Sequence, residues 1–365
     1  MNRTTRTPPF RRPDGELVPG SIAQAGYLRL GGMDQWVMVR GESLANPPLI
    51  VLHGGPGMSE TFFLRRFNAP LETRFTVVYW DQRGAGRSFH RAIPRSSMTV
   101  ERFIADLDEL VEAVRARVGQ EKVAIFGHSW GSVLGVLYAA RFPDKVSVYV
   151  GGAQIGDWRA AESASYAWAL AEAERRGNRR ALRALRGIGP PPYDARALMT
   201  ERTWLNRFEG RLNAKTMWEL ARILSRGPES SVLDVPALVR GLRFSLDAMW
   251  PEVSALNLVR RVPALRIPVF FFLGRQDHWV PLDTSLAYFG ALDAPSKTLV
   301  WFGRSGHQMF ADEPATFNAS MLDLVRPAAV REQLAAPRER PDTGIVPARG
   351  PARREGGVPT VRTPA

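Results

Sequence analysis

The chain has 365 residues with a formal net charge of +13; 45% of them are hydrophobic, 23% are charged and none is cysteine. This length exceeds what one ordinary core needs, so we expect one large domain with an insertion, or two domains. The composition is that of a globular protein, and the lack of cysteine excludes disulfides, thiolate metal ligands and a cysteine nucleophile. No apolar run approaches the ~20 residues of a transmembrane helix, and the basic start lacks the apolar segment of a secretory signal. We therefore expect a cytoplasmic protein with no membrane partner.

Almost all of the positive charge comes from arginine. Only four of the 49 basic residues are lysine, whereas surfaces that follow phosphate backbones use both cations. Such a bias is typical of genomic codon composition. Zinc-finger spacing and aromatic–basic RNA-binding motifs are absent as well, so the sequence predicts no nucleic-acid partner.

In chain order, residues 1–20 are predicted to be a flexible arm, followed by an antiparallel hairpin of Tyr27–Leu30 and Gln35–Val39. Short apolar runs then alternate with amphipathic helical stretches, of which Val100–Val118 is the clearest. The runs that read as buried strands are residues 49–52, 76–80, 123–126, 147–150, 269–273 and 298–301. This alternation predicts an α/β fold with a mostly parallel central sheet and helices on both faces.

Two regions break this rhythm. Residues 155–260 are rich in Ala, Arg, Leu and Trp, with helical periods and no convincing strand. An insertion between two parallel strands lies over their carboxyl ends, where such folds bind ligands, so we predict an all-helical lid there. The catalytic core would then comprise residues 21–154 and 261–326. Residues 327–365 contain seven prolines and little apolar periodicity, which predicts a disordered tail.

The strongest chemical signal is the segment Gly127-His128-Ser129-Trp130-Gly131. It follows the predicted strand 123–126 and precedes an apolar helix. In this context Gly-x-Ser-x-Gly is a nucleophile elbow, a turn too tight for side chains at its two glycine positions that exposes the serine hydroxyl. The sequence therefore predicts Ser129 as a nucleophile.

A serine hydroxyl needs a base, and the base needs an acid that orients it. After such an elbow both follow later in the chain, the acid first. Asp277 follows the strand 269–273, and His307 follows the strand 298–301. Of the five histidines, only His307 comes after both an acid and a strand. We therefore predict a triad of Ser129, His307 and Asp277.

A second motif, His53-Gly54-Gly55-Pro56-Gly57, follows the strand 49–52. A glycine-rich turn there lets a backbone N–H face the nucleophile, and the N–H of Trp130 supplies a second donor, so the pair predicts an oxyanion hole. His53 reads as a structural hydrogen-bonding residue. No cluster has metal-ligand spacing, and hydrolysis by a triad requires no cofactor, so we expect neither a metal nor a cofactor.

With these two motifs and the segment 81–88 (Asp-Gln-Arg-Gly-Ala-Gly-Arg-Ser) in view, the sequence resembles the α/β-hydrolase superfamily and, within it, the prolyl iminopeptidase-like family. The resemblance runs from about Ser21 to Val325 and is weakest in the lid. It implies a serine-type aminopeptidase that releases an N-terminal residue, typically proline, from small peptides. It also implies a triad and two oxyanion-hole donors, which would be Ser129, Asp277 and His307, with Gly55 and Trp130.

The chain departs from the family pattern around the predicted site. Family members often have glycine at the position of His128, and another small residue at the position of Met58. Peptidases of this family also hold the substrate's α-amine with lid glutamates, one of them in a Trp-Glu pair.

The nearest match to that pair is Phe208-Glu209, in a segment that begins at Trp204. Glu209 and Trp204 are therefore the candidate substrate-binding residues of the lid. Glu219 and Glu252 are candidates for a second amine-binding glutamate on spacing alone.

We thus predict a serine hydrolase that forms an acyl-enzyme with a small-molecule or short-peptide substrate beneath a helical lid. A carboxylesterase or arylamidase acting on small acyl substrates would use the same triad, so peptide and ester remain open. The alternative from another class is a non-catalytic α/β-hydrolase-like binding scaffold. Such scaffolds commonly lose a triad member, and none is missing here. The sequence does not indicate an oligomeric state.

Overall fold

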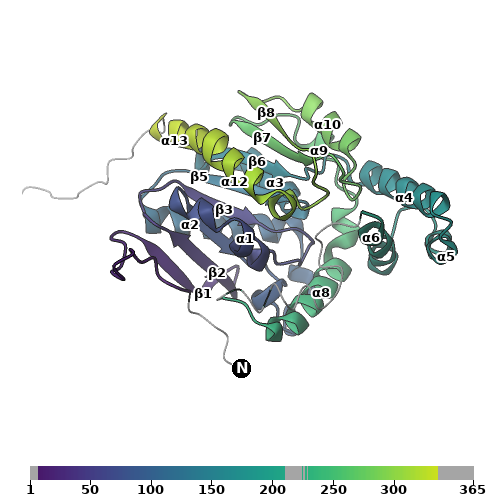
Figure 1. The fold of residues 1–365 in the computed structure, drawn as a ribbon, viewed down its shortest axis with the longest axis horizontal. Coiled ribbons are helices and arrows are strands. Elements are labelled where there is room, and N and C mark those ends of the chain that lie inside the picture. Colours follow the sequence, from purple (N-terminus) through teal and green to yellow (C-terminus); the bar gives the residue numbers. More distant parts are fainter. Residues whose placement is uncertain (1–6, 210–223, 225–226, 228, 336–365) are drawn as a thin grey trace, which may run out of the picture.

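The computed structural model describes residues 7–209, 224, 227 and 229–335. In this part of the chain an eight-stranded sheet has the order β1-β2-β4-β3-β5-β6-β7-β8 (Figure 1). β1 and β2 form an antiparallel hairpin, β2 pairs antiparallel with β4, and the remaining neighbours are parallel. The strands are β1 (Ile22–Leu30), β2 (Met33–Gly41), β3 (Pro48–Leu52), β4 (Thr76–Trp80), β5 (Val123–His128), β6 (Val146–Gly152), β7 (Val269–Gly274) and β8 (Lys297–Phe302). The predicted fold class is confirmed.

Both faces of the central sheet are buried because alternate side chains enter two different apolar cores. On β3, Ile50 and Leu52 belong to one core and Leu49 and Val51 to the other. The first core includes side chains of α2 (Val100–Val118), α3 (Trp130–Arg141) and α10 (Leu282–Ala291). The second includes side chains of α1 (Thr61–Phe67), α11 (Met309–Asp312), α12 (Pro314–Ser320) and α13 (Arg326–Ala335). This explains why the strands read as continuous apolar runs rather than as alternating ones.

Helix α2 has the bounds predicted from its apolar periodicity. The side chain of Thr99 accepts a hydrogen bond from the N–H of Arg102 at the amino end, a standard N-cap. At the carboxyl end Gly119 adopts φ 67°, a left-handed conformation that glycine reaches without steric cost.

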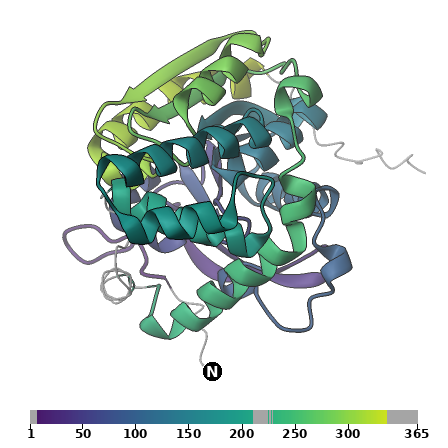
Figure 2. The same cartoon turned by 90° about the vertical axis from the view of Figure 1, so that its right-hand side faces the viewer.

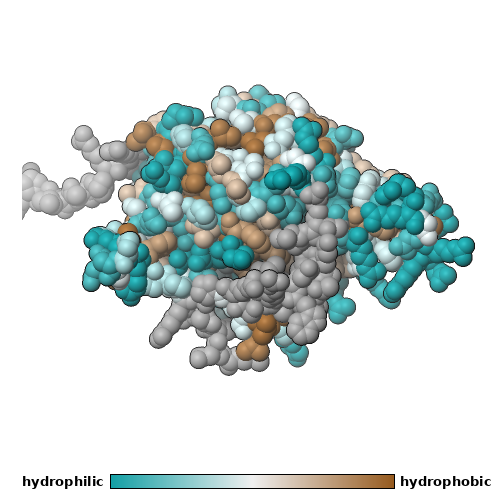
Figure 3. All heavy atoms as spheres, in the orientation of Figure 1, coloured by the Kyte–Doolittle hydropathy of each residue, from teal (hydrophilic) through white to brown (hydrophobic). Residues whose placement is uncertain are grey.

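In the described part of the insertion between β6 and β7, helices alternate with connecting segments and no strand of the sheet occurs. The helices are α4 (Trp158–Arg175), α5 (Arg179–Ile188), α6 (Ala195–Glu209), α8 (Val235–Val253) and α9 (Leu258–Arg261). In Figures 1 and 2 helices α4, α5 and α6 stand at one end of the sheet as a cap over the core. Hydrophilic side chains cover their outer side (Figure 3). Across the described residues, no helix is long and apolar enough to cross a membrane.

The cap has a small apolar core of its own. Trp204, Leu205 and Phe208 of α6 pack there against alanines of α4 and α5. This core is separate from the two that flank the sheet.

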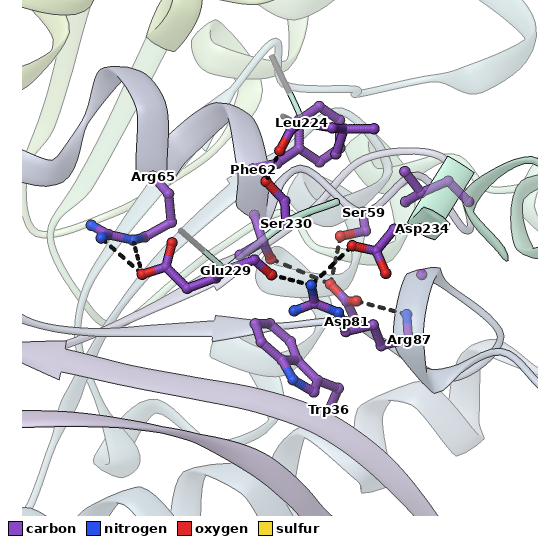
Figure 4. A pocket seen from close by; sticks show the side chains of 13 residues that line it. Trp36, Ser59, Phe62, Arg65, Asp81, Arg87, Leu224, Glu229, Ser230 and Asp234 are labelled. Carbon is purple, nitrogen blue, oxygen red and sulfur yellow. Dashed lines mark hydrogen bonds and ion pairs between the residues drawn. The ribbon is translucent and has the colours of Figure 1, made fainter. Parts of the chain in front are cut away.

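Ion pairs attach the later part of the insertion to the sheet domain, and two of them are drawn in Figure 4. The guanidinium of Arg65, on α1, lies 3.0 Å from the carboxylate of Glu229. That of Arg87, in the loop after β4, lies 3.0 Å from the carboxylate of Asp234, just before α8. A pocket of about 30 Å³ lies between them, and the contacts attach the insertion to the sheet domain.

The termini differ from the expected arm and tail. Residues 7–20 make defined contacts, including hydrogen bonds from the Arg40 guanidinium to Thr7 and to the Pro8 carbonyl. Helix α13 extends into the predicted tail as far as Ala335 and buries Ala328 and Ala329. Alanines provide enough apolar surface for one helical face, a signal that the proline count of the whole segment obscured. Residues 1–6 and 336–365 lie outside the described residues.

Candidate active site

Ser129 occupies a strained turn between β5 and α3. Its backbone has φ 53° and ψ −118°, a region that residues other than glycine rarely adopt. A Cβ at Gly127 would lie 2.2 Å from the carbonyl oxygen of Gly131, and one at Gly131 would lie 2.0 Å from that of Leu52. Both glycines of the motif are therefore required by close backbone approach, and the turn has the geometry of a nucleophile elbow.

His307 and Asp277, which lie 30 residues apart in the sequence, meet beside this turn. Nδ1 of His307 lies 3.0 Å from Oδ2 of Asp277, and both residues are 4% exposed. The other carboxylate oxygen, Oδ1, accepts hydrogen bonds from the backbone N–H groups of Trp279 and Val280 at 2.9 Å each. A carboxylate only accepts, so Nδ1 of His307 donates to it and Nε2 of the neutral ring carries a lone pair.

Burial lowers the pKa of His307, and the neighbouring Asp277 offsets only part of that effect. The ring is therefore neutral over most of the physiological range, the state that a general base requires. The indole of Trp279 stacks on it with ring centroids 5.0 Å apart.

One cavity of about 170 Å³ contains both Ser129 and His307 in its wall. Its floor is formed by the loops at the carboxyl ends of the strands, and its roof by α4, α6 and α8. The apolar lining residues of the roof are Trp158, Ala161, Leu198, Met199, Leu242, Leu246 and Trp250.

The loop after β3 borders the same cavity through Gly54 and Gly55. Gly55 has φ 118°, and a Cβ there would lie 2.4 Å from the N of Gly57, so only glycine fits this turn. Trp130 is the first residue of α3, so its N–H has no acceptor within the helix and lies at the positive end of the helix dipole. Gly55 thus borders the cavity, and Trp130 directly follows Ser129 in its wall.

His53 is part of the framework of this loop. Its Nδ1 lies 2.8 Å from the Gly54 carbonyl oxygen, and its Nε2 accepts a hydrogen bond from the N–H of Gln82. Burial lowers its pKa. This agrees with the structural role expected from the sequence.

The structure does not bring the two lid candidates, Glu209 and Trp204, to the cavity. Helix α6 faces the cavity with Met199, Arg202, Thr203 and Asn206, which are three or four residues apart. Trp204 lies on the opposite side of the helix, in the small apolar core of the cap.

Glu209 lies one turn beyond the cavity-facing residues of α6. Its Oε1 accepts a hydrogen bond from the N–H of His278, at 2.9 Å, in the loop that carries Asp277. Burial, with a further contribution from Asp277, raises the pKa of Glu209 to about 9, so its carboxyl is neutral at pH 7.

Of the two candidates for a second amine-binding glutamate, Glu252 does not line the cavity. Oε2 of Glu252 accepts the N–H of Val100 at the start of α2, so it caps a helix. Glu219 lies outside the described residues.

A group of buried charges that sequence reasoning missed lies in the roof. Glu162 on α4 and Arg202 on α6 both line the cavity and form a close ion pair, and Glu201 pairs with the same guanidinium at 2.6 Å. Oε2 of Glu162 has no hydrogen-bond partner among the described residues. Burial, against the lowering effect of Arg202, raises the pKa of Glu162 to about 7. Nothing in the sequence distinguishes Glu162 from the solvated acids of the same helix.

A second missed residue is Glu60, which precedes α1 and also lines the cavity. Its Oε1 lies 2.7 Å from Nδ1 of His128 in the elbow. Among the described residues, no group of three or more His, Asp or Glu side chains is arranged to hold a metal ion.

The sequence matches the alpha/beta hydrolase fold family over residues 47–314. A probable aminopeptidase, YbaC, from Bacillus subtilis is 32% identical over 301 residues, which are 81% of this chain and 94% of that protein. A probable proline iminopeptidase from Streptomyces coelicolor is 43% identical over 116 residues, but these cover only 30% of this chain and 34% of that one.

Solved structures show the same fold at lower identity. Proline iminopeptidase from Mycobacterium smegmatis superposes with a TM-score of 0.60 at 22% identity, over 86% of this chain and all of that one. An esterase from Rhodococcus, RhEst1, gives 0.55 at 18% identity over 84% of this chain and 98% of that one. A peptidase and an esterase thus share this fold, so the fold by itself does not distinguish the two activities.

Proposed function

We propose that this chain, which belongs to the alpha/beta hydrolase fold family, is a serine hydrolase that releases the N-terminal residue of short peptides. Ser129 is the nucleophile, His307 the general base and Asp277 the acid that orients it. One observation carries the proposal: a strained serine and a carboxylate-bound histidine lie in the wall of the same lid-covered cavity.

The mechanism follows from the proton positions. Nδ1–H of His307 is held by Asp277, so Nε2 takes the proton of the Ser129 hydroxyl as its oxygen attacks the substrate carbonyl. The N–H groups of Gly55 and Trp130 stabilise the negative oxygen that develops, by roughly 3–4 kcal/mol per donor. His307 then gives the proton to the leaving amine, and water releases the acyl group from Ser129 by the same steps.

The cavity supports removal of a terminal residue rather than cleavage within a long chain. Its roof closes over Ser129 with apolar side chains, which suits one small apolar residue such as proline on the acyl side. The relatives of this chain include a probable aminopeptidase and proline iminopeptidases.

An aminopeptidase also needs a partner for the substrate's protonated α-amine. Among the described residues, two acids line the cavity, Glu60 and Glu162. Both oxygens of Glu60 already have donors, from His128 and the Gly54 N–H. Oε2 of Glu162 is a buried oxygen with no donor among the described residues, so a substrate amine reaches it only after the Glu162 side chain turns toward the cavity. We therefore assign the amine contact to Glu162 in place of Glu209, which lies outside the cavity and is neutral at pH 7.

The test is an activity panel of proline-, alanine- and arginine-anilides beside short-chain nitrophenyl esters, with Ser129→Ala as the control. We expect the proline- or alanine-anilide to have the highest kcat/KM, and Ser129→Ala to lower kcat by about 10⁴ or more on every substrate. Ester turnover without anilide turnover would support the esterase alternative. No turnover on any substrate would support the binding scaffold.

A further inference from the structure

Three segments of the proposed site are joined through one buried pair, Glu60 and His128. Oε1 of Glu60 lies 2.7 Å from Nδ1 of His128, and Oε2 of Glu60 accepts the N–H of Gly54 in the oxyanion loop. On the other side of the ring, Nε2 of His128 lies 2.8 Å from the carbonyl oxygen of His307. The chain of contacts thus runs from the oxyanion loop, through the residue before Ser129, to the backbone of the base.

The hydrogen bonds fix the number of protons in this pair. The carbonyl oxygen of His307 only accepts, so Nε2 of His128 must carry a proton. If Nδ1 had none, its lone pair would face a carboxylate oxygen at 2.7 Å, which is repulsive. One further proton therefore lies between Nδ1 and Oε1, and the pair is complete only while it holds that proton.

The pair is buried and closely packed. Glu60 is 2% and His128 1% exposed, so solvent screens their attraction little. The His128 ring is 5.0 Å from that of Phe310 and 4.8 Å from that of His307. A Cβ at Gly54 would lie 3.2 Å from Oε1 of Glu60 and 3.3 Å from Cβ of Ser129.

We propose that Glu60 and His128 are positioning residues that hold the oxyanion loop, the elbow and the backbone of His307 in one fixed arrangement. This inference rests on the proposed function, because it assigns a role relative to Ser129 and His307. The pair acts on the reacting atoms through the positions of these three segments, and so stabilises the transition state through geometry. Its loss should lower kcat and leave KM nearly unchanged.

The variants Glu60→Gln and Glu60→Ala differ in the hydrogen bonds that they can keep. A glutamine at position 60 can donate from its amide to Nδ1 of a neutral His128 and accept the Gly54 N–H with its carbonyl oxygen. It keeps every hydrogen bond but has no proton to lose. An alanine removes both contacts and leaves Nδ1 of His128 buried without a partner.

The pH dependence provides a second readout. Burial alone would lower the pKa of His128, but Glu60, together with the His307 carbonyl and Asp277, more than offsets this and the pKa is raised. The other charged or titratable groups that act on this ring are His307 and Asp277 at the strand ends and His53 in the loop after β3. Raising the pH through the raised pKa removes the shared proton, so activity should fall on the alkaline side. The acid limb belongs to His307, whose pKa is lowered.

The experiment compares Glu60→Ala and Glu60→Gln with wild type on a neutral nitrophenyl ester, which has no amine to titrate. Glu101→Ala, at an exposed acid on α2, serves as a control. We expect Glu60→Ala to lower kcat by about 10²-fold, the typical cost of misplacing catalytic groups by 1 Å, with KM unchanged. Glu60→Gln should recover most of this loss and remove the alkaline limb while keeping the acid limb.

The rate of fluorophosphonate labelling separates this inference from the proposed function. If wild type is labelled at Ser129 and Glu60→Ala is labelled as fast, the positioning role is contradicted and the proposed triad stands. If wild type is not labelled, the proposed function itself fails. A folded Glu60→Ala that changes KM and not kcat, or a Glu60→Gln no better than alanine, would also overturn the inference.

Discussion

The floor and the roof of the cavity differ in how their side chains are positioned. In the floor, Ser129, Asp277 and His307 each follow a strand of one parallel sheet, and the backbone brings them to the same edge. In the roof, helices α4, α6 and α8 supply the lining, and a side chain reaches the cavity only if its helix is turned the right way. Sequence spacing therefore locates a strand-end residue well and a lid residue poorly.

The sharpest test of the floor is the Asp277→Asn variant. The amide can present N–H to Nδ1 of His307 in place of an accepting oxygen, which favours the tautomer with the proton on Nε2. We expect kcat to fall by about 10⁴ on anilides and esters alike, as in other triads. Retention of most activity would mean that another group orients His307.

The roof is tested by Glu162→Gln, with the anilide and the ester compared. A charge-assisted contact with the α-amine contributes about 1.5–3 kcal/mol, so kcat/KM for a proline-anilide should fall by about 10- to 150-fold. A neutral ester makes no such contact and should change little. Equal losses of kcat/KM on both substrates would contradict this assignment and would mean that Glu162 has only a structural role as the partner of Arg202.

The same residue predicts a pH dependence of substrate binding. Burial raises the pKa of Glu162 to about 7, so lowering the pH through this value protonates the carboxylate and removes its charge. KM for the proline-anilide should therefore rise as the pH falls below about 7, while KM for the ester stays constant. A flat KM for the anilide between pH 8 and pH 5.5 would contradict the assignment.

Variants of Glu209 test whether this residue binds the substrate's α-amine, as the sequence suggested, or holds only the His278 N–H, as in the structure. Glu209→Gln keeps an acceptor for the His278 N–H and matches the neutral carboxyl, so both substrates should lose little activity. Glu209→Ala removes the hydrogen bond, worth about 0.5–1.5 kcal/mol, and should slow both substrates equally, by about 2- to 10-fold in kcat. A loss confined to the anilide would restore Glu209 as an amine-binding residue.

The smallest expected effect concerns helix α13. A chain that ends at residue 326 lacks the buried Ala328 and Ala329 and the hydrogen bond from the Lys122 N–H to Gln333. Its melting temperature should lie about 1–2 °C below that of a chain ending at Ala335 for each kcal/mol that these contacts contribute, given the entropy of unfolding of a chain of this length. Identical melting temperatures would show that α13 does not stabilise the core.

Some features of the fold and of the candidate site could be predicted from the sequence, and others could not. The strands, α2 and the elbow carry local signals: apolar runs, a Thr99 cap, and glycines whose backbones touch. Glu60 and Glu162 carry none, because each acts through a residue distant in the sequence, His128 and Arg202 respectively. The sequence shows a histidine at position 128 where family members often have glycine, but it does not show that Glu60 is the partner of this histidine. Only the folded chain brings such pairs together.

The central claim is that Ser129 is a nucleophile activated by His307, and covalent trapping tests it most directly. The intact protein is treated with a fluorophosphonate, and the modified peptide is identified by mass spectrometry. We predict one adduct, on Ser129, which forms at the rate at which anilide activity is lost and is strongly slowed in His307→Ala. An adduct on another serine, or equal labelling of Ser129 with and without His307, would contradict the account.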